Sequence, residues 1–539
     1  MTRMSGGQAL VKSVLQHGVD TIFALPGVQV DHLFNALHDE GNAIRVIHTR
    51  HEQGAAYMAN GYAQSTGKVG VFAVVPGPGL LNTTAALATA YGCNVPVLAI
   101  SGQIPSYAIG RGLGMLHEIP DQLAMIRGVT KWAERIEHPS QAPGLVNEAF
   151  RQLQTGRPRP VEIEMALDVM ADQAEVELLT PGEIPPAPAP DPAAIASAAK
   201  SLGEAENPVI AVGGGVFGAE AELLELAEML QAPVLANRMG RGALSDRHYL
   251  AQTNPAGFDL WQDSDVVLGV GTRMQTPMMF WGAKGKKILR IDIDPAEIGR
   301  HGKPALSIVA DAKAALAALI PEVAKHNKQR ASREAELNAL KQAKIAEFED
   351  KLAPQMAYLK VLREALPDDG ILVDELTQVG YMARIAFPVY QPRTLIGSGY
   401  QGTLGSGYAT ALGVKVANPD RPVLSINGDG GFMYNVQEIS TAVQQNIALP
   451  AVVFEDGAFG NVQRMQRELH DGRVIATDLR NPDFAALAES FGAAAFRANS
   501  PEELAKVLPE ALALNGPSIV AVKVGRMPDP WTTIMPRRS

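Results

Sequence analysis

The segment VLSINGDGGF, residues 423–432, runs from an apolar stretch into a glycine-rich turn. Val, Leu and Ile dominate residues 423–426, which predicts a buried strand. Glycines directly after a strand let an anion approach the backbone, and a helix that begins there favours negative charge. The segment therefore predicts a strand, an anion-binding turn and a helix, the repeating unit of a parallel α/β sheet.

Two carboxyl groups follow neighbouring predicted strands in this part of the chain. Asp429 lies in the glycine-rich turn, and Asp456 follows the apolar run at 450–454. Mg²⁺ takes oxygen ligands and commonly shares them with the phosphates of a bound molecule. Short Gly-Asp-Gly segments also occur in ordinary turns, but the two strand contexts together favour a metal and phosphate site.

The same alternation of apolar strands and helical segments extends over most of the 539 residues, which are too many for one core. A Pro- and Ala-rich stretch at 177–195 predicts a linker. A mixed-charge stretch at 322–354 predicts a solvated helix. We therefore expect an α/β protein with three consecutive doubly wound parallel-sheet domains, at 1–175, 195–325 and 355–539.

Composition narrows the class of protein. A hydrophobic content of 46% with 19% charged residues is typical of a globular chain, and the net charge of -10 argues against a nucleic-acid partner. The single cysteine, Cys93, excludes an internal disulfide framework. The first residues lack the apolar core of a signal peptide, and no apolar run is long enough to cross a membrane. We expect a cytoplasmic protein with neither a membrane nor a nucleic-acid partner.

A third carboxyl group, Glu52, precedes an apolar helical run at 55–63. A glutamate at a helix start often only compensates the helix dipole. Here the flanking segments favour a site: Pro76 to Gly79 follow the next predicted strand, and Ser101 to Gln103 follow the strand beyond it. Together with Asn82, these turns predict a cavity along one edge of the first sheet.

Glu52 and the segment at 428–432, taken together, resemble thiamine diphosphate enzymes of the acetolactate synthase, pyruvate oxidase and benzoylformate decarboxylase group. The resemblance covers nearly the whole chain and is closest to acetolactate synthase-like proteins. It implies a pyrimidine-binding, a middle and a diphosphate-binding domain. In that family the glutamate protonates the cofactor's pyrimidine ring, and the activated cofactor attacks a 2-oxo acid, which loses CO₂. The glutamate of one subunit meets the diphosphate domain of another, which implies a homodimer or homotetramer with active sites at the subunit interface.

The resemblance also assigns site residues. Glu52 is implied as the activating acid, and the metal ligands are Asp429, Asp456 and the carbonyl oxygen of Ala458. Leu404 takes the place of the bulky side chain that bends the cofactor. The cofactor-binding residues implied in this way are Pro26, Gly27, Pro76, Asn82, Thr377, Gln378, Gly402, Leu404, Gly428, Gly430, Gly431, Phe459 and Gly460.

Several positions depart from the family pattern. Asp456 stands where the family commonly has Asn. Acetolactate synthases generally carry Phe-Gln where this chain has Leu116-His117, and Met and Trp where it has Asn461 and Met465. His117 is a candidate proton donor during turnover, although a lone histidine is often only structural. The departures leave open whether the product of decarboxylation, an enamine, is protonated or joined to a second carbonyl compound.

The middle block contains Gly213-Gly214-Gly215-Val216-Phe217-Gly218 after an apolar strand, which formally matches a dinucleotide-binding loop. No acidic residue ends the next strand at 234–237, so ribose recognition is unsupported. Relatives bind FAD, another nucleotide or nothing here, so FAD stays open. Two rival interpretations are a flavin- or nicotinamide-dependent oxidoreductase and a non-catalytic relative that binds the cofactor.

Overall fold

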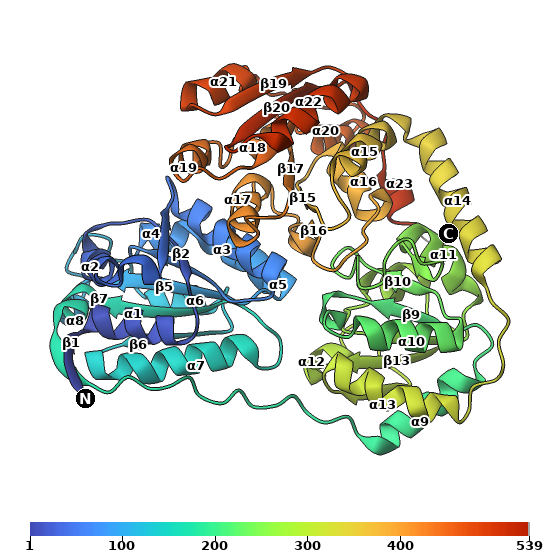
Figure 1. Cartoon of the computed structure of the whole chain (residues 1–539), viewed down its shortest axis with the longest axis horizontal. Helices are drawn as coiled ribbons and strands as arrows, with labels where there is room; N and C mark the ends of the chain where they lie inside the picture. The colour runs from blue at the N-terminus through green and yellow to red at the C-terminus, as the bar shows by residue number, and fades with distance from the viewer. Residues whose placement is uncertain (537–539) are drawn as a thin grey trace.

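The computed structural model describes residues 1–536, and over these residues the chain forms three six-stranded parallel sheets and one two-stranded antiparallel sheet (Figure 1). Helices flank each of the large sheets, which confirms the predicted α/β class. In Figure 1 the blue and cyan first domain lies at the lower left, the green middle domain at the lower right, and the orange and red third domain above both.

The first sheet has the strand order β3-β2-β4-β5-β7-β6. A short antiparallel pair of β1 (Thr2–Ser5) and β8 (Gln173–Val176) joins the start of this domain to its end. The six strands are β2 (Thr21–Ala24), β3 (Arg45–His48), β4 (Gly70–Val74), β5 (Val97–Gln103), β6 (Trp132–Ile136) and β7 (Val161–Ala166). The helices of the domain are α1 (Gly6–Gln16), α2 (Asp31–Asp39), α3 (Glu52–Thr66), α4 (Pro78–Asn82), α5 (Thr84–Cys93), α6 (Gln122–Arg127), α7 (Ala142–Gln154) and α8 (Leu167–Ala171).

The third sheet, β16-β15-β17-β18-β20-β19, repeats the strand order of the first sheet. Its strands are β15 (Ile371–Asp374), β16 (Leu395–Ile396), β17 (Val423–Gly428), β18 (Pro450–Glu455), β19 (Ala494–Ala498) and β20 (Ser518–Lys523). The helices around it are α15 (Ala353–Ala365), α16 (Gln378–Ala386), α17 (Gly407–Ala417), α18 (Asp429–Phe432), α19 (Glu438–Gln444), α20 (Gly460–Leu469), α21 (Phe484–Phe491), α22 (Pro501–Ala513) and α23 (Trp531–Ile534).

The middle sheet has a different order, β11-β10-β9-β12-β13-β14. Counted along its own strands this is 3-2-1-4-5-6, the order of dinucleotide-binding sheets. Its strands are β9 (Val209–Val212), β10 (Val234–Ala236), β11 (Ala251–Gln252), β12 (Val266–Val270), β13 (Lys287–Asp292) and β14 (Leu306–Val309), and its helices are α9 (Pro192–Glu204), α10 (Glu220–Leu230), α11 (Asn254–Asp263), α12 (Pro295–Ile298) and α13 (Ala312–Ala324).

The connections between the units differ in kind. Residues 177–191 are mostly exposed and contain neither helix nor strand, as the proline content predicts. The second connection is not one helix over 322–354: α13 ends at Ala324, and α14 (Glu334–Lys351) begins after an irregular segment. Across residues 1–536, none of the helices combines the length and apolar character needed to traverse a lipid bilayer.

Helices α3 and α17 hold the first and third domains together (Figure 1). They approach backbone to backbone: a Cβ at Gly61 would lie 2.0 Å from the Thr410 carbonyl oxygen, and one at Gly413 would lie 1.9 Å from that of Met58. Glycine is therefore required at both positions. This contact fixes the orientation of α3, which begins at Glu52.

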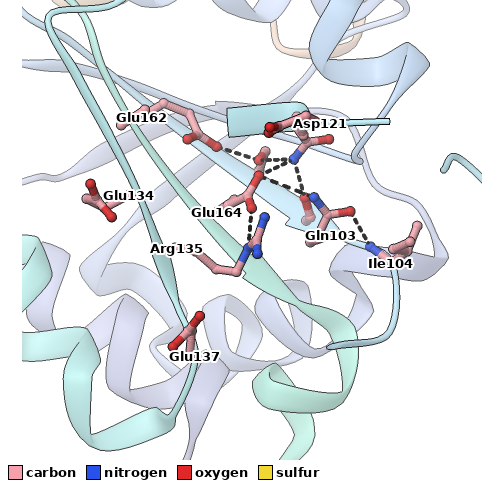
Figure 2. Close-up of polar contacts among 12 residues, drawn as sticks. Gln103, Ile104, Asp121, Glu134, Arg135, Glu137, Glu162 and Glu164 are labelled. Atoms are coloured by element: carbon pink, nitrogen blue, oxygen red, sulfur yellow. Dashed lines mark hydrogen bonds and ion pairs between the residues drawn. The ribbon is translucent and has the colours of Figure 1, made fainter. Parts of the chain in front are cut away.

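A pair of glutamates is buried on β7 in the first sheet (Figure 2). Glu164 forms an ion pair with Arg135, and Glu162 accepts a hydrogen bond from Ser101 Oγ at 2.6 Å. Burial, and then the nearby carboxylate of Glu164, raise the pKa of Glu162 well above its ordinary value of 4.5, while Ser101, Arg135 and Arg127 act in the opposite direction. Burial and the neighbouring carboxylate therefore favour the protonated form of Glu162.

We expect the variant Glu162→Gln to be more stable than the wild type at alkaline pH. A raised carboxyl pKa stabilises the fold below the unfolded-state pKa, and this stabilisation is lost as pH rises toward the folded-state pKa. The amide does not titrate, so its advantage should grow by up to about 1.4 kcal/mol per pH unit across that window. Thermal denaturation at pH 5, 7 and 9 measures this, with the exposed Glu137→Gln as control. An advantage that does not change with pH would contradict the assignment.

Candidate active site

Asp429 and Asp456 follow adjacent strands of the third sheet. Gly428, the last residue of β17, is paired with Phe454 of β18, so both carboxyl groups lie at the carboxyl edge of this sheet. Ligands of open α/β sheets bind at this edge. The parallel register thus brings together two side chains that are well separated in the sequence.

The Asp429 carboxylate is only 2% exposed and is held by three donors. Its Oδ2 accepts hydrogen bonds from Asn481 Nδ2 at 2.7 Å and from Gly457 N at 2.8 Å, and its Oδ1 accepts one from Gly430 N. Burial raises its pKa, and these donors oppose that shift. The donors fix the carboxylate in one orientation, as a metal ligand requires. Asn481 is a site residue that the sequence motifs do not indicate.

Asp456 lies close enough to interact with Asp429. Burial, and then the charge of Asp429, raise its pKa to about 6. Two carboxylates that oppose each other's ionisation form a place for a divalent cation. Over residues 1–536 no three side chains of His, Cys, Asp and Glu gather as a metal site, so the remaining ligands would be backbone oxygens such as that of Ala458, phosphate oxygens and water.

The start of α16 lies beside the metal-binding loop. Thr377 precedes this helix, and Gln378 is its first residue. Gln378 Oε1 is buried without a hydrogen-bond partner among the described residues, and Gln378 Nε2 would be 3.9 Å from a Cβ added at Gly460. The unused atom is an acceptor, so it fits a metal ion or a water ligand beside the two carboxylates, whereas the Nε2 group and the helix start could donate to a diphosphate.

Packing within the protein explains why glycine is needed at some positions of this loop. A Cβ at Gly430 would lie 2.6 Å from the Phe459 ring, and one at Gly460 would lie 2.5 Å from Asp456 Oδ2. A Cβ at Gly428 would have room, with its closest contact at 3.4 Å. Gly402 has a φ of +56°, with open space around a Cβ. The expectation that glycine serves cofactor approach therefore explains only part of the pattern.

Glu375 lies beneath this loop, and the sequence motifs do not point to it. Its Oε1 accepts a hydrogen bond from Gly405 N at 2.7 Å, next to the half-buried Leu404, and a Cβ at Gly431 would collide with its carboxylate. Burial raises the pKa of Glu375 to about 7. Glu375 therefore links the segment at Leu404 and Gly405 to the glycine-rich turn at Gly431. The acidic pair Asp374-Glu375 at the end of an apolar strand is the signal that the sequence offers.

Glu52 lies in the first domain, as the first residue of α3. Its side chain is 13% exposed, and its Oε2 accepts a hydrogen bond from Asn82 Nδ2 at 2.9 Å. A Cβ at Gly79 would lie 3.5 Å from its Oε1. The turns on either side are close-packed, since Pro76 is buried and Gly27 abuts Val75, whereas Pro26 is exposed.

A residue of the third domain holds the segment before Glu52. The buried carboxylate of Glu438, in α19, accepts hydrogen bonds from the backbone N–H groups of Arg50 and His51 at 3.0–3.2 Å. Burial raises the pKa of Glu438. In residues 1–536, however, no hydrogen bond or ion pair joins Glu52 itself to Asp429 or Asp456.

His117 lies beside the Glu52 half of the site. It adopts a φ of +68°, which is uncommon for a residue with a side chain. Its carbonyl oxygen would lie 2.2 Å from a Cβ at Gly77, and its Nδ1 is buried without a hydrogen-bond partner among the described residues. The structure therefore places His117 against the turn at Gly77. Helix α4 begins at this turn and ends at Asn82, the hydrogen-bond partner of Glu52.

The glycine-rich loop of the middle domain lines a cavity of about 550 Å³ between the three domains. Gly213 and Gly215 pack against the backbone of Gly271. Asn237, which follows β10, donates to Thr272 Oγ1 and stands where an acidic residue would bind a ribose. Arg238 donates across the domain boundary to the Gly399 carbonyl oxygen. The volume admits a ligand, but the local chemistry does not identify FAD.

These features define a class of protein: an enzyme whose site can hold a diphosphate through a metal between two α/β domains. The chain matches the N-terminal TPP binding domain of thiamine pyrophosphate enzymes over residues 4–125, their central domain over 195–319 and their C-terminal TPP binding domain over 377–522. This chain belongs to the thiamine pyrophosphate (thiamine diphosphate) enzyme family.

Curated relatives extend over nearly the full chain. It is 35% identical to the probable acetolactate synthase large subunit of Methanocaldococcus jannaschii, over 97% of this chain and 92% of that protein. It is 34% identical to the probable 2-ketoarginine decarboxylase AruI of Pseudomonas aeruginosa, over 96% and 94%. It is 34% identical to the acetolactate synthase of Arthrospira platensis, over 99% and 96%. The chain is accordingly a thiamine diphosphate-dependent enzyme of the decarboxylase and carboligase type.

Proposed function

We propose that this enzyme uses thiamine diphosphate and Mg²⁺ to decarboxylate a 2-oxo acid, and that it then protonates the product or joins it to a second carbonyl compound. The observation that carries the proposal is the pair Asp429 and Asp456 at one sheet edge, beside the unpaired amide of Gln378.

The proposed roles fall to residues of the first and third domains. Asp429, Asp456 and the Ala458 carbonyl would hold the metal, and Thr377 and Gln378 would contact the diphosphate. Glu52, fixed by Asn82, would keep a proton at the pyrimidine ring. The bound cofactor supplies an electron sink for the carbon–carbon bond that breaks. His117 is positioned to give a proton to the substrate-derived group.

Among residues 1–536 no hydrogen bond or ion pair joins Glu52 to Asp429 or Asp456, so one chain does not bring the activating acid to the two metal-site carboxylates. Large apolar side chains near both halves are exposed: Val28, Leu116, Met433, Tyr434, Val462 and Met465. Such surface is typical of subunit interfaces. It supports the proposal that the enzyme is a homodimer or homotetramer, with Glu52 of one subunit facing the metal loop of another. The domain limits 1–175, 195–325 and 355–539 and the cytoplasmic location stay predictions.

The donor acid is the open question, because the relatives include both an acetolactate synthase and a 2-ketoarginine decarboxylase. We expect at least one 2-oxo acid to be decarboxylated only when thiamine diphosphate and Mg²⁺ are both present. A panel from pyruvate through 2-ketoarginine to phenylglyoxylate, with products identified by mass, separates carboligation from simple release. Cofactor binding without turnover of any acid would favour the non-catalytic alternative.

The comparisons give no support to a flavin- or nicotinamide-dependent oxidoreductase. A structural role for FAD in the cavity between the domains is a separate matter, and the absorbance spectrum of the purified protein decides it. A yellow protein whose decarboxylation does not require thiamine diphosphate would favour the oxidoreductase instead.

A further inference from the structure

The turn at Gly77 is held by a buried side chain outside the residues assigned so far. Gln122, the first residue of α6, is 2% exposed. Its Oε1 accepts the Gly77 N–H at 2.8 Å, and its Nε2 donates to Glu164 Oε2 at 2.8 Å and to the Gly102 carbonyl oxygen at 3.1 Å. Gln122 thus connects the turn to the buried ion pair of Glu164 and Arg135. Figure 2 labels the two residues of this ion pair.

The polarity of these contacts requires a primary amide at position 122. The Gly77 N–H is a donor and needs an acceptor, whereas the Gly102 carbonyl and the Glu164 carboxylate are acceptors and need a donor. A carboxylate would face Glu164 with like charge. An apolar side chain of the same length would leave a buried N–H group without a partner, which is costly.

Gly77 is the residue from which α4 starts, and α4 ends at Asn82. Asn82 donates to Glu52 Oε2, and Gly79, in the first turn of α4, packs beside Glu52 Oε1. Because α4 is a single short helix, a shift of Gly77 moves the group that orients the Glu52 carboxyl.

Gly77 also lies against His117. Its φ of +57° and the close approach of the His117 carbonyl oxygen both exclude a side chain there. One loop leads from His117 to Gln122 and touches Gly77 at both ends, once through a carbonyl group and once through an amide. Gly77 is therefore held by His117 at one end of this loop and by Gln122 at the other.

We propose that Gln122 is a positioning residue, which sets the placement of Glu52 and His117 through the Gly77 turn. The inference rests on the proposed function for the roles of those two groups, but the contacts themselves do not. Small displacements of reacting groups, near 1 Å, cost about 10²-fold in rate. Gln122 should therefore affect kcat without touching substrate or cofactor.

The test compares Gln122→Met with Gln103→Met. Gln103 is also buried, donates to the same Glu164 Oε2 at 3.3 Å, and accepts the Ile104 N–H at 2.8 Å. Both variants remove an amide beside one carboxylate, but only Gln122→Met releases Gly77. Gln122→Met also loses the bonds to Ser101 Oγ and to the Gly102 carbonyl oxygen, so the local readout at residues 76–82 is what distinguishes release of the turn from a general loss of packing.

The first readout is hydrogen exchange of the cofactor-free protein, followed by mass spectrometry. We expect the peptide covering 76–82 to exchange at least about tenfold faster in Gln122→Met, since its anchoring bond is lost. In Gln103→Met it should stay within about twofold of the wild type. Equal protection in the two variants would overturn the proposal.

The second readout is catalysis with the cofactor and Mg²⁺ bound. We expect Gln122→Met to lower kcat by about 10- to 100-fold with KM changed less than about threefold, and Gln103→Met to leave both near wild type. A rate loss no larger than that of Gln103→Met would contradict the proposal. A wild type without cofactor-dependent turnover would refute the proposed function, while the exchange experiment would still decide the inference.

A charge-conserving swap covers the case in which Gln122→Met does not fold. The single change Gln122→Glu places like charges together and should slow turnover by about 10²-fold. Adding Glu164→Gln restores a donor–acceptor pair between the two positions. We expect the double variant to recover at least about tenfold of the loss. Additive losses in the double variant would show that the bond between these residues does not position the turn.

Discussion

The variant Glu52→Gln is expected to lose thiamine diphosphate-dependent turnover by about 10²- to 10⁴-fold, the range for removal of one acid–base group. The amide keeps the size of the side chain and can still accept the hydrogen bond from Asn82 Nδ2. It cannot hold a transferable proton at the pyrimidine ring. Stability should change little, because Glu52 is half-buried at a helix start and makes one hydrogen bond.

The measurement is the rate of deuterium exchange at the C2 position of the bound cofactor, together with kcat for the best 2-oxo acid. The exposed variant Glu175→Gln, in the same domain, serves as control and should behave as wild type. Unchanged exchange and turnover in Glu52→Gln would remove Glu52 from the chemistry and with it the assignment of the first half of the site.

A second large effect is expected from Asp429→Asn, which should weaken thiamine diphosphate binding at saturating Mg²⁺ by at least about 100-fold, or about 2.7 kcal/mol. All three donors around Asp429 point at a carboxylate. The amide that replaces this carboxylate would lack the negative charge that binds the metal. Its NH₂ group would also face one of these N–H donors, with no acceptor there.

Asp456→Asn is the matched control, because the family commonly has Asn at this position. Burial, and then the charge of Asp429, raise the carboxyl pKa of Asp456 to about 6, so its charged form is disfavoured without a metal. We expect cofactor affinity within about tenfold of the wild type. Isothermal titration of both variants compares the two positions, and equal losses would contradict the assignment of Asp429 as the dominant ligand.

The fold class followed from the sequence because apolar strands at 423–426 and 450–454 end in turns rich in glycine and acidic residues. The identical strand order of the first and third sheets did not follow, since strand pairing depends on contacts between distant segments. The break between α13 and α14 was missed for a related reason: polar composition predicts a solvated segment but does not locate the helix ends.

The site residues also divide into those that local sequence indicates and those that depend on contacts between distant segments. Residues that carry the resemblance, such as Glu52 and Asp429, could be indicated from motifs. Glu375, Glu438 and Gln122 could not, because each acts through backbone N–H groups of segments far away in the chain. Nothing in the local sequence marks a buried polar side chain whose partner is remote.

The most direct test of the account is a crystal structure of the enzyme with thiamine diphosphate and Mg²⁺. We predict that the pyrimidine ring nitrogen lies within hydrogen-bond distance of Glu52, that Asp429 and Asp456 ligate the metal, and that these residues come from different subunits. A cofactor bound in the cavity between the three domains, or a Glu52 side chain directed away from the ring, would contradict the central claim.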